Sequence, residues 1–333
     1  MKDDSTVVVL LAVVGIVGHI TALWILQKST KQRNPKHVFL LRCLAANDMV
    51  AQIGMLSLII LLPHFKNRWM CAGFVLVRAF GLGSGCVAFV MAVERYLALT
   101  KPFFYQQCVT FRVLQIAIAS IWSFGLFLTY LPLAGFGVYY SPNNETNSSR
   151  PVCRRYKDAK EFKDVTYSYV YFVVGVTLCT CIAYCNTKVF MALSRMGNQR
   201  KVLIRRISRS TMNNRVERCR QNATTEELAF AKVMAVLCIT FIICWLPQMI
   251  MIPIMHLDKD NKLTVGLNKI ADSLIMFYFA FDPYIYVVQK YFDKRRQAYR
   301  AKRSNSNTAH SSTSVGAGTP TAVLIQHPEK EVL

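Results

Sequence analysis

The chain has 333 residues, of which 53% are hydrophobic and only 17% carry a charge. Soluble globular domains usually contain about 25% charged residues, so this composition argues against an ordinary soluble enzyme. Lys and Arg number 40 against 18 Asp and Glu, which gives a formal net charge of +22. A balance this basic is typical of proteins that meet nucleic acid or an anionic membrane surface, and the positions of the charges distinguish the two.

Seven long apolar segments follow one another along the chain. A bilayer core about 30 Å thick needs roughly 20 apolar residues per helix, and each segment reaches that length. The seventh is the weakest, because Asn268, Lys269 and Asp272 interrupt its first half. The sequence therefore predicts an all-α membrane protein with seven transmembrane helices, at about residues 7–27, 38–65, 71–99, 113–133, 167–190, 228–255 and 263–289.

Basic residues concentrate after the first, third, fifth and seventh segments. The positive-inside rule places such clusters in the cytoplasm, so we expect a multi-pass protein of the plasma membrane with its N-terminus outside and its C-terminus inside. The first segment is long enough to span the bilayer and no cleavage site follows it, which favours a retained helix over a signal peptide. Because the basic clusters flank spans, we expect them to meet membrane lipids and not nucleic acid.

Residues of the predicted outer side agree with this topology. Two glycosylation sequons, at Asn144 and Asn147, lie in the loop between the fourth and fifth segments. Cys71 begins the third segment at the outer face, and Cys153 lies in the same outer loop. An oxidising exterior would let these two cysteines form a disulfide; the alternative is that both are free thiols.

Several ionisable or helix-kinking residues fall inside the apolar segments, where a charge is expensive and marks a functional site by default. Asp48 lies in the second segment, and Arg78 lies about two turns into the third. The chain shows no Gly-rich phosphate loop and no zinc pattern of cysteines, so we expect no catalytic site, metal centre or cofactor. Three short motifs occupy later segments: Glu94-Arg-Tyr96, Cys244-Trp-Leu-Pro247 and Asp282-Pro-Tyr-Ile-Tyr286.

In this order, and with Trp122 in the fourth segment, the motifs resemble those of the rhodopsin-like family of G-protein-coupled receptors. The resemblance covers about residues 7–303. It implies a seven-transmembrane helix bundle, a short amphipathic eighth helix at about 290–303 marked by Phe292, and coupling to a heterotrimeric G protein. It also implies arrestin and receptor kinases as partners of the tail, 304–333, whose Ser, Thr and Gly content predicts disorder.

The resemblance also implies an activation switch in the inner half of the bundle. Arg95 at the inner membrane edge needs a counter-charge, and Glu227 resembles the partner that closes the inactive state in this family. Alternatively, Glu227 is a solvated charge at a helix N-terminus, where the helix dipole favours it. The sixth segment would pivot at its proline, and the remaining switch residues are Glu94, Tyr96, Trp245, Pro247, Asp282, Pro283 and Tyr286.

A second polar group lies deeper in the predicted bundle. We expect Asp48 and Asp282 to share a sodium ion or a water with Ser84; alternatively, these groups only hydrogen-bond between helices. One nearby position departs from the family pattern, because His19 stands where an Asn is expected in the first segment.

Within the family, three stretches resemble prostanoid receptors, and the E-type prostaglandin receptors look most similar. These stretches are residues 91–105, 131–140 and 282–286. Two positions depart from that pattern: Ser273 stands where prostanoid receptors carry an Arg that pairs with the ligand carboxylate, and Val152 stands where they carry a Trp. The resemblance implies a prostaglandin-like lipid that bears a carboxylate, and a stimulatory G protein that raises cyclic AMP.

Arg78 is then the candidate carboxylate anchor, because a guanidinium binds a carboxylate bidentately and a low dielectric strengthens the pair. Lys269 is the second candidate, and Ser273 and Trp245 complete the expected ligand site. Alternatively, Arg78 pairs with Asp272 or faces the outer loop. A rhodopsin-like receptor for a peptide or another non-lipid ligand remains an alternative. A transporter or channel is disfavoured, because the sequence shows no symmetric repeats.

Overall fold

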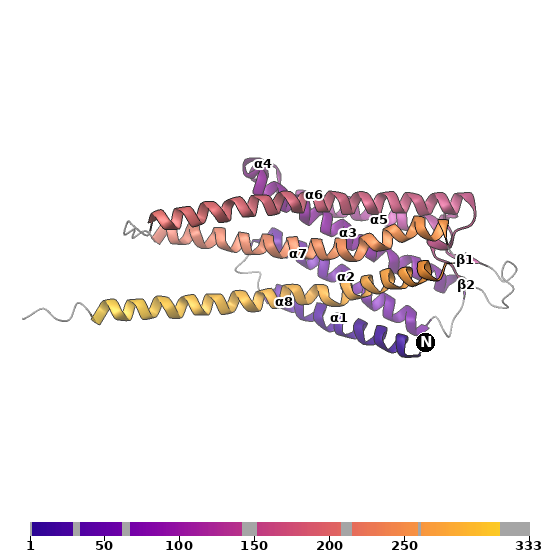
Figure 1. Cartoon of the computed structure of the whole chain (residues 1–333), viewed down its shortest axis with the longest axis horizontal. Helices are drawn as coiled ribbons and strands as arrows, with labels where there is room; N and C mark the ends of the chain where they lie inside the picture. Colours follow the sequence, from indigo (N-terminus) through magenta and orange to yellow (C-terminus); the bar gives the residue numbers. More distant parts are fainter. Residues whose placement is uncertain are drawn as a thin grey trace, which may run out of the picture. The chain divides into compact units, whose positions relative to one another are not determined.

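The computed structural model describes six stretches of backbone: residues 2–28, 34–61, 67–141, 152–207, 215–258 and 261–313. Within them, the side chains of 197–229 and of most residues after 288 are not described. The chain divides into two compact units, Met1–Val287 and Val288–Leu333. Figure 1 labels the α-helices and the two strands. The described elements are α1 (Lys2–Lys28), α2 (Pro35–Leu61), α3 (Arg68–Thr100), α4 (Pro102–Cys108), α5 (Phe111–Tyr130), η1 (Leu131–Ala134), β1 (Tyr140–Ser141), β2 (Val152–Cys153), η3 (Tyr156–Asp158), α6 (Phe162–Ile207), α7 (Arg215–Leu257) and α8 (Lys262–Thr313).

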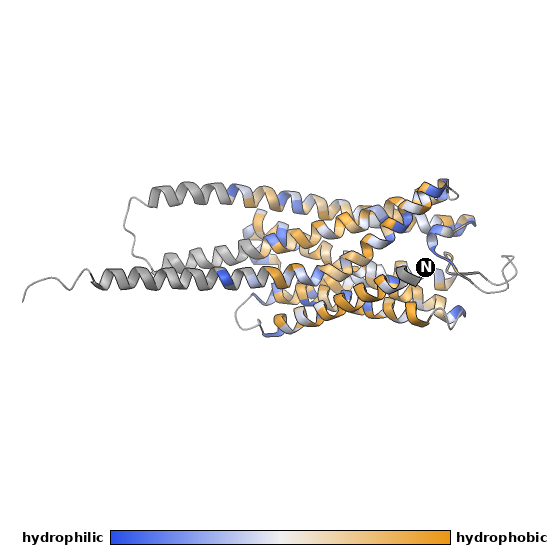
Figure 2. Ribbon diagram, turned by 60° about the horizontal axis from the view of Figure 1, so that its bottom comes forward, coloured by the Kyte–Doolittle hydropathy of each residue, from blue (hydrophilic) through white to orange (hydrophobic). Residues whose placement is uncertain are grey.

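Among the described residues, seven helices are long and apolar enough to cross a membrane: α1, α2, α3, α5 with η1, α6, α7, and α8 as far as Val288. The predicted seven-helix bundle is therefore confirmed. Figure 2 shows apolar residues along the middle of these helices and hydrophilic residues toward their ends. Large apolar side chains such as Trp24, Ile116 and Phe127 remain more than half exposed. In a bilayer this is the expected state of lipid-facing residues, because the lipid tails take the place of a covering layer.

The helix α4 was not predicted from the sequence. It is a short helix between the third and fourth spans, and Pro102 occupies its first turn. Proline is well suited to that position, because its missing N–H would be unpaired there anyway and its φ angle is already helical. Thr110 then caps the next helix, α5, by accepting a hydrogen bond from the Val113 amide at 3.3 Å.

The second unit contains the C-terminal part of α8. Residues 290–303, where the sequence predicts an amphipathic helix, are helical, but they continue α8 without a break. The helix ends at Thr313, beyond the end expected at 303. No Gly or Pro occurs between Pro283 and Gly316, and such residues are what usually ends a helix. The domain boundary at 303 and the disordered tail stay predictions.

The helix α3 lies at the centre of the first unit and packs against α2, α5, α6 and α7. One of its glycines lets an aromatic ring of α7 approach closely. A Cβ at Gly85 would lie 2.8 Å from Phe241, whereas a Cβ at Gly81 would lie at an ordinary 3.5 Å from Trp245. Small residues at such contacts allow membrane helices to pack without an aqueous hydrophobic driving force.

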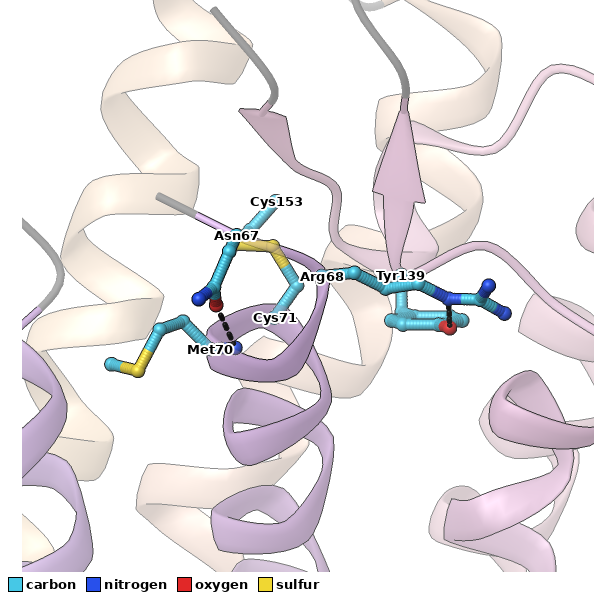
Figure 3. The surroundings of a disulfide bond; sticks show 6 residues. All are labelled: Asn67, Arg68, Met70, Cys71, Tyr139 and Cys153. Atoms are coloured by element: carbon cyan, nitrogen blue, oxygen red, sulfur yellow. Dashed lines mark hydrogen bonds between the residues drawn. A yellow bond between two sulfur atoms is a disulfide. The ribbon is translucent and has the colours of Figure 1, made fainter. Parts of the chain in front are cut away.

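A two-stranded hairpin covers one end of the bundle. Strands β1 and β2 pair antiparallel, with Tyr140 opposite Cys153. The predicted disulfide between Cys71 and Cys153 is present and joins this hairpin to the start of α3 (Figure 3). Beside it, Arg68 donates to the Tyr139 hydroxyl at 2.7 Å. We call this the disulfide end of the bundle, and the opposite end, where Arg95 lies, the Arg95 end.

Candidate functional site

The Arg78 side chain faces the loop that covers the disulfide end. Its guanidinium lies over the ring of Tyr156, at 4.6 Å from the centroid. Tyr156 belongs to η3 and is buried, with 6% of its surface exposed. One guanidinium nitrogen of Arg78, Nη1, is buried and has no hydrogen-bond partner among the described residues. Arg78 therefore presents an unused donor to the interior of this end.

Three more buried polar atoms of α6 and α7 have no hydrogen-bond partner in the part of the chain that the structure describes. They are the Tyr167 hydroxyl, Gln248 Oε1 and Trp245 Nε1. Tyr167 lies near Arg78, and Gln248 lies near the Tyr156 side chain. Leaving a buried polar group unpaired costs about 1–3 kcal/mol. The unpaired atoms of Arg78, Tyr167 and Gln248 are therefore candidates for polar contacts with a ligand.

The loop residue Tyr156 is fixed in place from several sides. Ser168 of α6 donates to its carbonyl oxygen at 2.6 Å, and its ring packs on that of Tyr171 with centroids 5.0 Å apart. Burial raises the pKa of the Tyr156 hydroxyl, and the neighbouring Arg78 charge opposes that rise. Tyr156 thus fills the space over the Arg78 guanidinium.

Asp272 does not pair with Arg78, which was one alternative from the sequence. Its partners come from the loop: Arg155 Nη1 donates to Asp272 Oδ2 at 2.5 Å, and Lys157 Nζ lies 3.6 Å from Oδ1. Lys157 also donates to Asn268 Oδ1 at 2.7 Å and is only 2% exposed. Sequence reasoning missed Lys157, because a lysine among many loop charges gives no sign that folding buries it.

Lys269 and Ser273, both expected in the ligand site, are exposed on α8. The Ser273 hydroxyl donates to the Lys269 carbonyl oxygen at 2.9 Å, within the helix. The residue of this helix turn that contacts the loop is Asp272. Of the predicted polar ligand-site residues, only Arg78 is therefore placed against the loop, while Trp245 lies deeper in the bundle.

The burial of Lys157 makes the stability of the fold depend on pH. Burial lowers the pKa of the Lys157 ammonium from 10.5 to about 8, although Asp272 opposes the shift. Between these two values the unfolded chain binds a proton that the folded chain has released, so stability rises with pH through this window. From pH 7 to pH 9, we expect the wild type to gain about 1 kcal/mol relative to Lys157→Met. Thermal unfolding of both proteins at the two pH values measures this gain; an equal pH response in both would contradict it.

Trp245 is buried on α7 and forms part of an aromatic stack. Its ring lies 5.4 Å from that of Phe241, and Phe241 meets the edge of Tyr278 of α8 at 5.6 Å. Pro247 lies inside the same helix, two residues further on. A proline inside a helix removes a backbone hydrogen bond and allows a bend. The stack thus joins α7 to α8 near the proline.

The polar centre of the bundle joins α2, α3 and α5. Ser84 donates to Asp48, and Asn47 Nδ2 lies 2.7 Å from Ser84 Oγ. Trp122 of α5 donates to Asn47 Oδ1 at 3.1 Å. Asp48 and Asp282 are both buried and interact electrostatically. Asp48 Oδ2 and Asp282 Oδ1 have no hydrogen-bond partner among the described residues, so these two acceptors can receive a cation, a proton or a water.

A small cavity of about 20 Å³ lies beside Asp282 and is also lined by Pro283 and Tyr286. A cavity of this size holds about one water. On the neighbouring helix α1, His19 Nε2 lies 3.1 Å from the Phe279 carbonyl oxygen. The histidine thereby replaces the expected Asn as a link between α1 and α8.

At the Arg95 end, Arg95 is held by more residues than the sequence suggested. Both Glu94 oxygens accept hydrogen bonds from its guanidinium, and Tyr105 of α4 donates to Glu94 at 2.6 Å. On the other side, Arg95 Nη2 lies 2.6 Å from His37 Nε2. Arg95 also lies over the Phe230 ring of α7, at 5.1 Å. Sequence reasoning missed His37, Tyr105 and Phe230. His37 and Phe230 lie far from Arg95 in the chain, and none of the three belongs to a motif.

Four further predicted residues remain: Tyr96 and Glu227 of the activation switch, and the sequon residues Asn144 and Asn147 of the loop between α5 and α6. Tyr96 packs near Tyr184 of α6, with ring centroids 6.2 Å apart. The side chain of Glu227 lies outside those described, so the pair with Arg95 stays a prediction. The sequons Asn144 and Asn147 also lie outside the described residues.

Comparison with known proteins agrees with this arrangement. Residues 18–286 match the family model of the 7 transmembrane receptor (rhodopsin family). The chain belongs to the rhodopsin family of seven-transmembrane receptors. The proteins of this family are receptors and not enzymes. The solved structure of squid rhodopsin shares the fold of this receptor, with a TM-score of 0.68 at 16% identity over 85% of this chain and 75% of that one.

Curated relatives of the receptor include both opsins and prostanoid receptors. It is 21% identical to melanopsin of Branchiostoma belcheri, over 89% of this chain and 41% of that protein. It is 26% identical to the human prostacyclin receptor, over 82% of this chain and 68% of that protein. It is 25% identical to the prostaglandin E2 receptor EP3 subtype of Bos taurus, over 83% of this chain and 69% of that protein. The receptor thus spans less than half the length of melanopsin and about two thirds of the two prostanoid receptors.

Proposed function

We propose that this receptor is activated by a lipid that carries a carboxylate, of the prostaglandin E class. The observation that carries the proposal is the Arg78 guanidinium, a cation in the disulfide-end half of α3 with an unused, buried donor nitrogen. A carboxylate satisfies such a donor and neutralises its charge in a low dielectric. The similarity to prostacyclin and prostaglandin E2 receptors supports the same ligand class.

The neighbouring unpaired atoms favour a ligand that also has a hydroxyl group. Arg78 and Tyr167 supply donors, which suit the two oxygens of a carboxylate. Gln248 Oε1 supplies an acceptor, which suits a ligand O–H. Beyond them lie the apolar ring of Trp245 and the fully buried Met249, which suit a hydrocarbon tail. This pattern fits a hydroxylated fatty acid better than a peptide, whose backbone would bring many more groups to pair.

In this proposal the ligand displaces Tyr156 from Arg78 and presses on the aromatic stack of Trp245 and Phe241. The helix α7 then pivots at Pro247, and its far part moves away from Arg95. A heterotrimeric G protein binds the opened Arg95 end, and the stimulatory class raises cyclic AMP. The disulfide end faces outward and the Arg95 end faces the cytoplasm of a plasma-membrane receptor, where arrestin and receptor kinases act on the tail.

The test is a response panel in cells that display the receptor at the surface. Cyclic AMP and calcium are recorded against prostaglandin E2, other prostanoids, unsubstituted fatty acids and a peptide library. We expect a response to prostaglandin E2 that exceeds the response to unsubstituted fatty acids. Silence toward every lipid, with a response to a peptide, would replace the lipid proposal by a peptide receptor.

We also propose that Asp48, Ser84 and Asp282 hold a sodium ion when the receptor is at rest. Replacing external sodium with a large organic cation is expected to raise agonist affinity about fivefold, because the ion and the agonist favour different conformations. Asp48→Asn removes the charge that holds the ion and should abolish this sodium effect. Radioligand binding in both ionic conditions measures it, and an unaltered sodium response in Asp48→Asn would refute the site.

A further inference from the structure

The inference concerns His37, a residue that none of the sequence motifs includes. It lies in the first turn of α2 and is buried, with 5% of its surface exposed. Its ring stacks on Phe230 of α7, with centroids 4.0 Å apart and an angle of 9° between the planes. Its Nε2 atom lies 2.6 Å from Arg95 Nη2. One imidazole therefore contacts two other helices at the Arg95 end.

The chemistry of this contact fixes the role of the imidazole. A guanidinium has donors only, so Arg95 must donate and His37 Nε2 must accept. The ring is then neutral, with its proton on Nδ1. His37 therefore adds an uncharged acceptor to the charged pair that Arg95 forms with Glu94, and the two partners hold the guanidinium from different sides.

Phe230 joins this arrangement to the helix that moves. It lies against the His37 ring and beneath the Arg95 guanidinium, so both contacts depend on where this part of α7 is. An aromatic stack and a cation–π contact are together enough to bias a two-state equilibrium severalfold. When α7 moves away, both contacts are lost together.

We infer that His37 is the positioning residue that holds Arg95 in the resting receptor and couples its release to α7. His37 and Phe230 form the clamp on one side of Arg95, and Glu94, held by Tyr105, forms the support on the other. Arg95 leaves His37 when Phe230 withdraws, and its donors then become available to the G protein. The inference rests on the family's coupling to a G protein and is independent of the ligand proposed above.

The experiment measures ligand-independent G-protein activation by the full-length receptor in cells, normalised to surface display. His37→Phe keeps a ring for Phe230 and removes the acceptor for Arg95. We expect it to raise basal activation about tenfold, the shift that follows from losing a charge-assisted hydrogen bond in a two-state equilibrium. His37→Gln keeps an acceptor and should return the basal level close to that of the wild type. Gln106→Ala, on the exposed side of α4, serves as the matched control and should change nothing.

Three outcomes would overturn the inference. Basal activation in His37→Phe equal to that of the wild type shows that Arg95 is restrained without His37; a rise in Glu227→Gln alone would then assign the restraint to Glu227. An equally high level in His37→Gln shows that the acceptor is not what matters. Phe230→Leu tests the coupling from the α7 side and replaces His37→Phe if that variant fails to reach the surface. It should raise basal activation severalfold, and an unchanged level would refute the clamp.

Discussion

Replacing Arg78 with Ala is expected to raise the half-maximal concentration of prostaglandin E2 by about 100-fold, with the maximal response retained at high ligand. The reason is the loss of the cation that would pair with the ligand carboxylate. Truncating one partner of a desolvated charge pair costs about 3 kcal/mol, and each 1.4 kcal/mol is a factor of ten. The measurement is a cyclic AMP dose response at matched surface display.

Two companion variants define what Arg78 contributes. Arg78→Lys keeps the charge and loses the planar fork that binds a carboxylate through two bonds, so we expect an intermediate loss of about tenfold. Lys269→Ala removes a cation that is exposed on α8, and it should shift the curve little. An unchanged dose-response curve in Arg78→Ala would show that Arg78 does not bind the ligand carboxylate. A large shift in Lys269→Ala would show that Lys269 binds it instead.

The substitution Gly83→Ala should destabilise the whole receptor by about 2–4 kcal/mol. A Cβ at this position would lie 2.7 Å from Asn47 Oδ1 and even closer to Trp122 Nε1. It would therefore break the hydrogen bond by which Trp122 holds Asn47. Asn47 in turn holds Ser84 and the carbonyl oxygen of Phe80, so the damage reaches three helices. Thermal unfolding of the solubilised receptor and surface display both report the effect.

A matched control lies on the same helix. The nearest atom to a Cβ at Gly81 is Trp245 Cζ2 at 3.5 Å, an ordinary contact distance. Gly81→Ala should therefore leave the unfolding temperature close to that of the wild type, and Ala is also the better helix former. Equal loss of stability in both variants would mean that a methyl group at either glycine of α3 destabilises the fold. The loss in Gly83→Ala could then not be assigned to the hydrogen bond between Trp122 and Asn47.

The sequence predicted the fold well because its strongest signals are long-range averages. Uncharged runs of bilayer length and alternating basic clusters depend on composition and survive small errors at the ends. The disulfide between Cys71 and Cys153 followed from topology alone, since both cysteines were placed on one side of the membrane. The helix α4 was missed because a seven-residue helix has too few positions for a periodic pattern.

The site was predicted less completely, and the reason is tertiary packing. Arg95 and Glu94 were found because a charge inside a span is rare. His37 looked like one more polar residue in a basic inner segment, and only the position of α7 reveals its contacts. Lys157 likewise looked like a solvated loop charge until the loop was seen to fold over the bundle. The continuation of α8 beyond residue 303 depended on missing helix breakers, a weak signal in a polar tail.

The loop over the disulfide end also bears on the timing of signals. It is attached to α3 by a covalent bond, to α6 through the Tyr156 carbonyl oxygen, and to α8 through Asp272. In the proposed function, a ligand that takes the place of Tyr156 has to pass this loop, so we expect loop opening to limit both its association and its dissociation. We therefore expect slow binding and a long residence time, and a signal that outlasts a brief pulse of agonist.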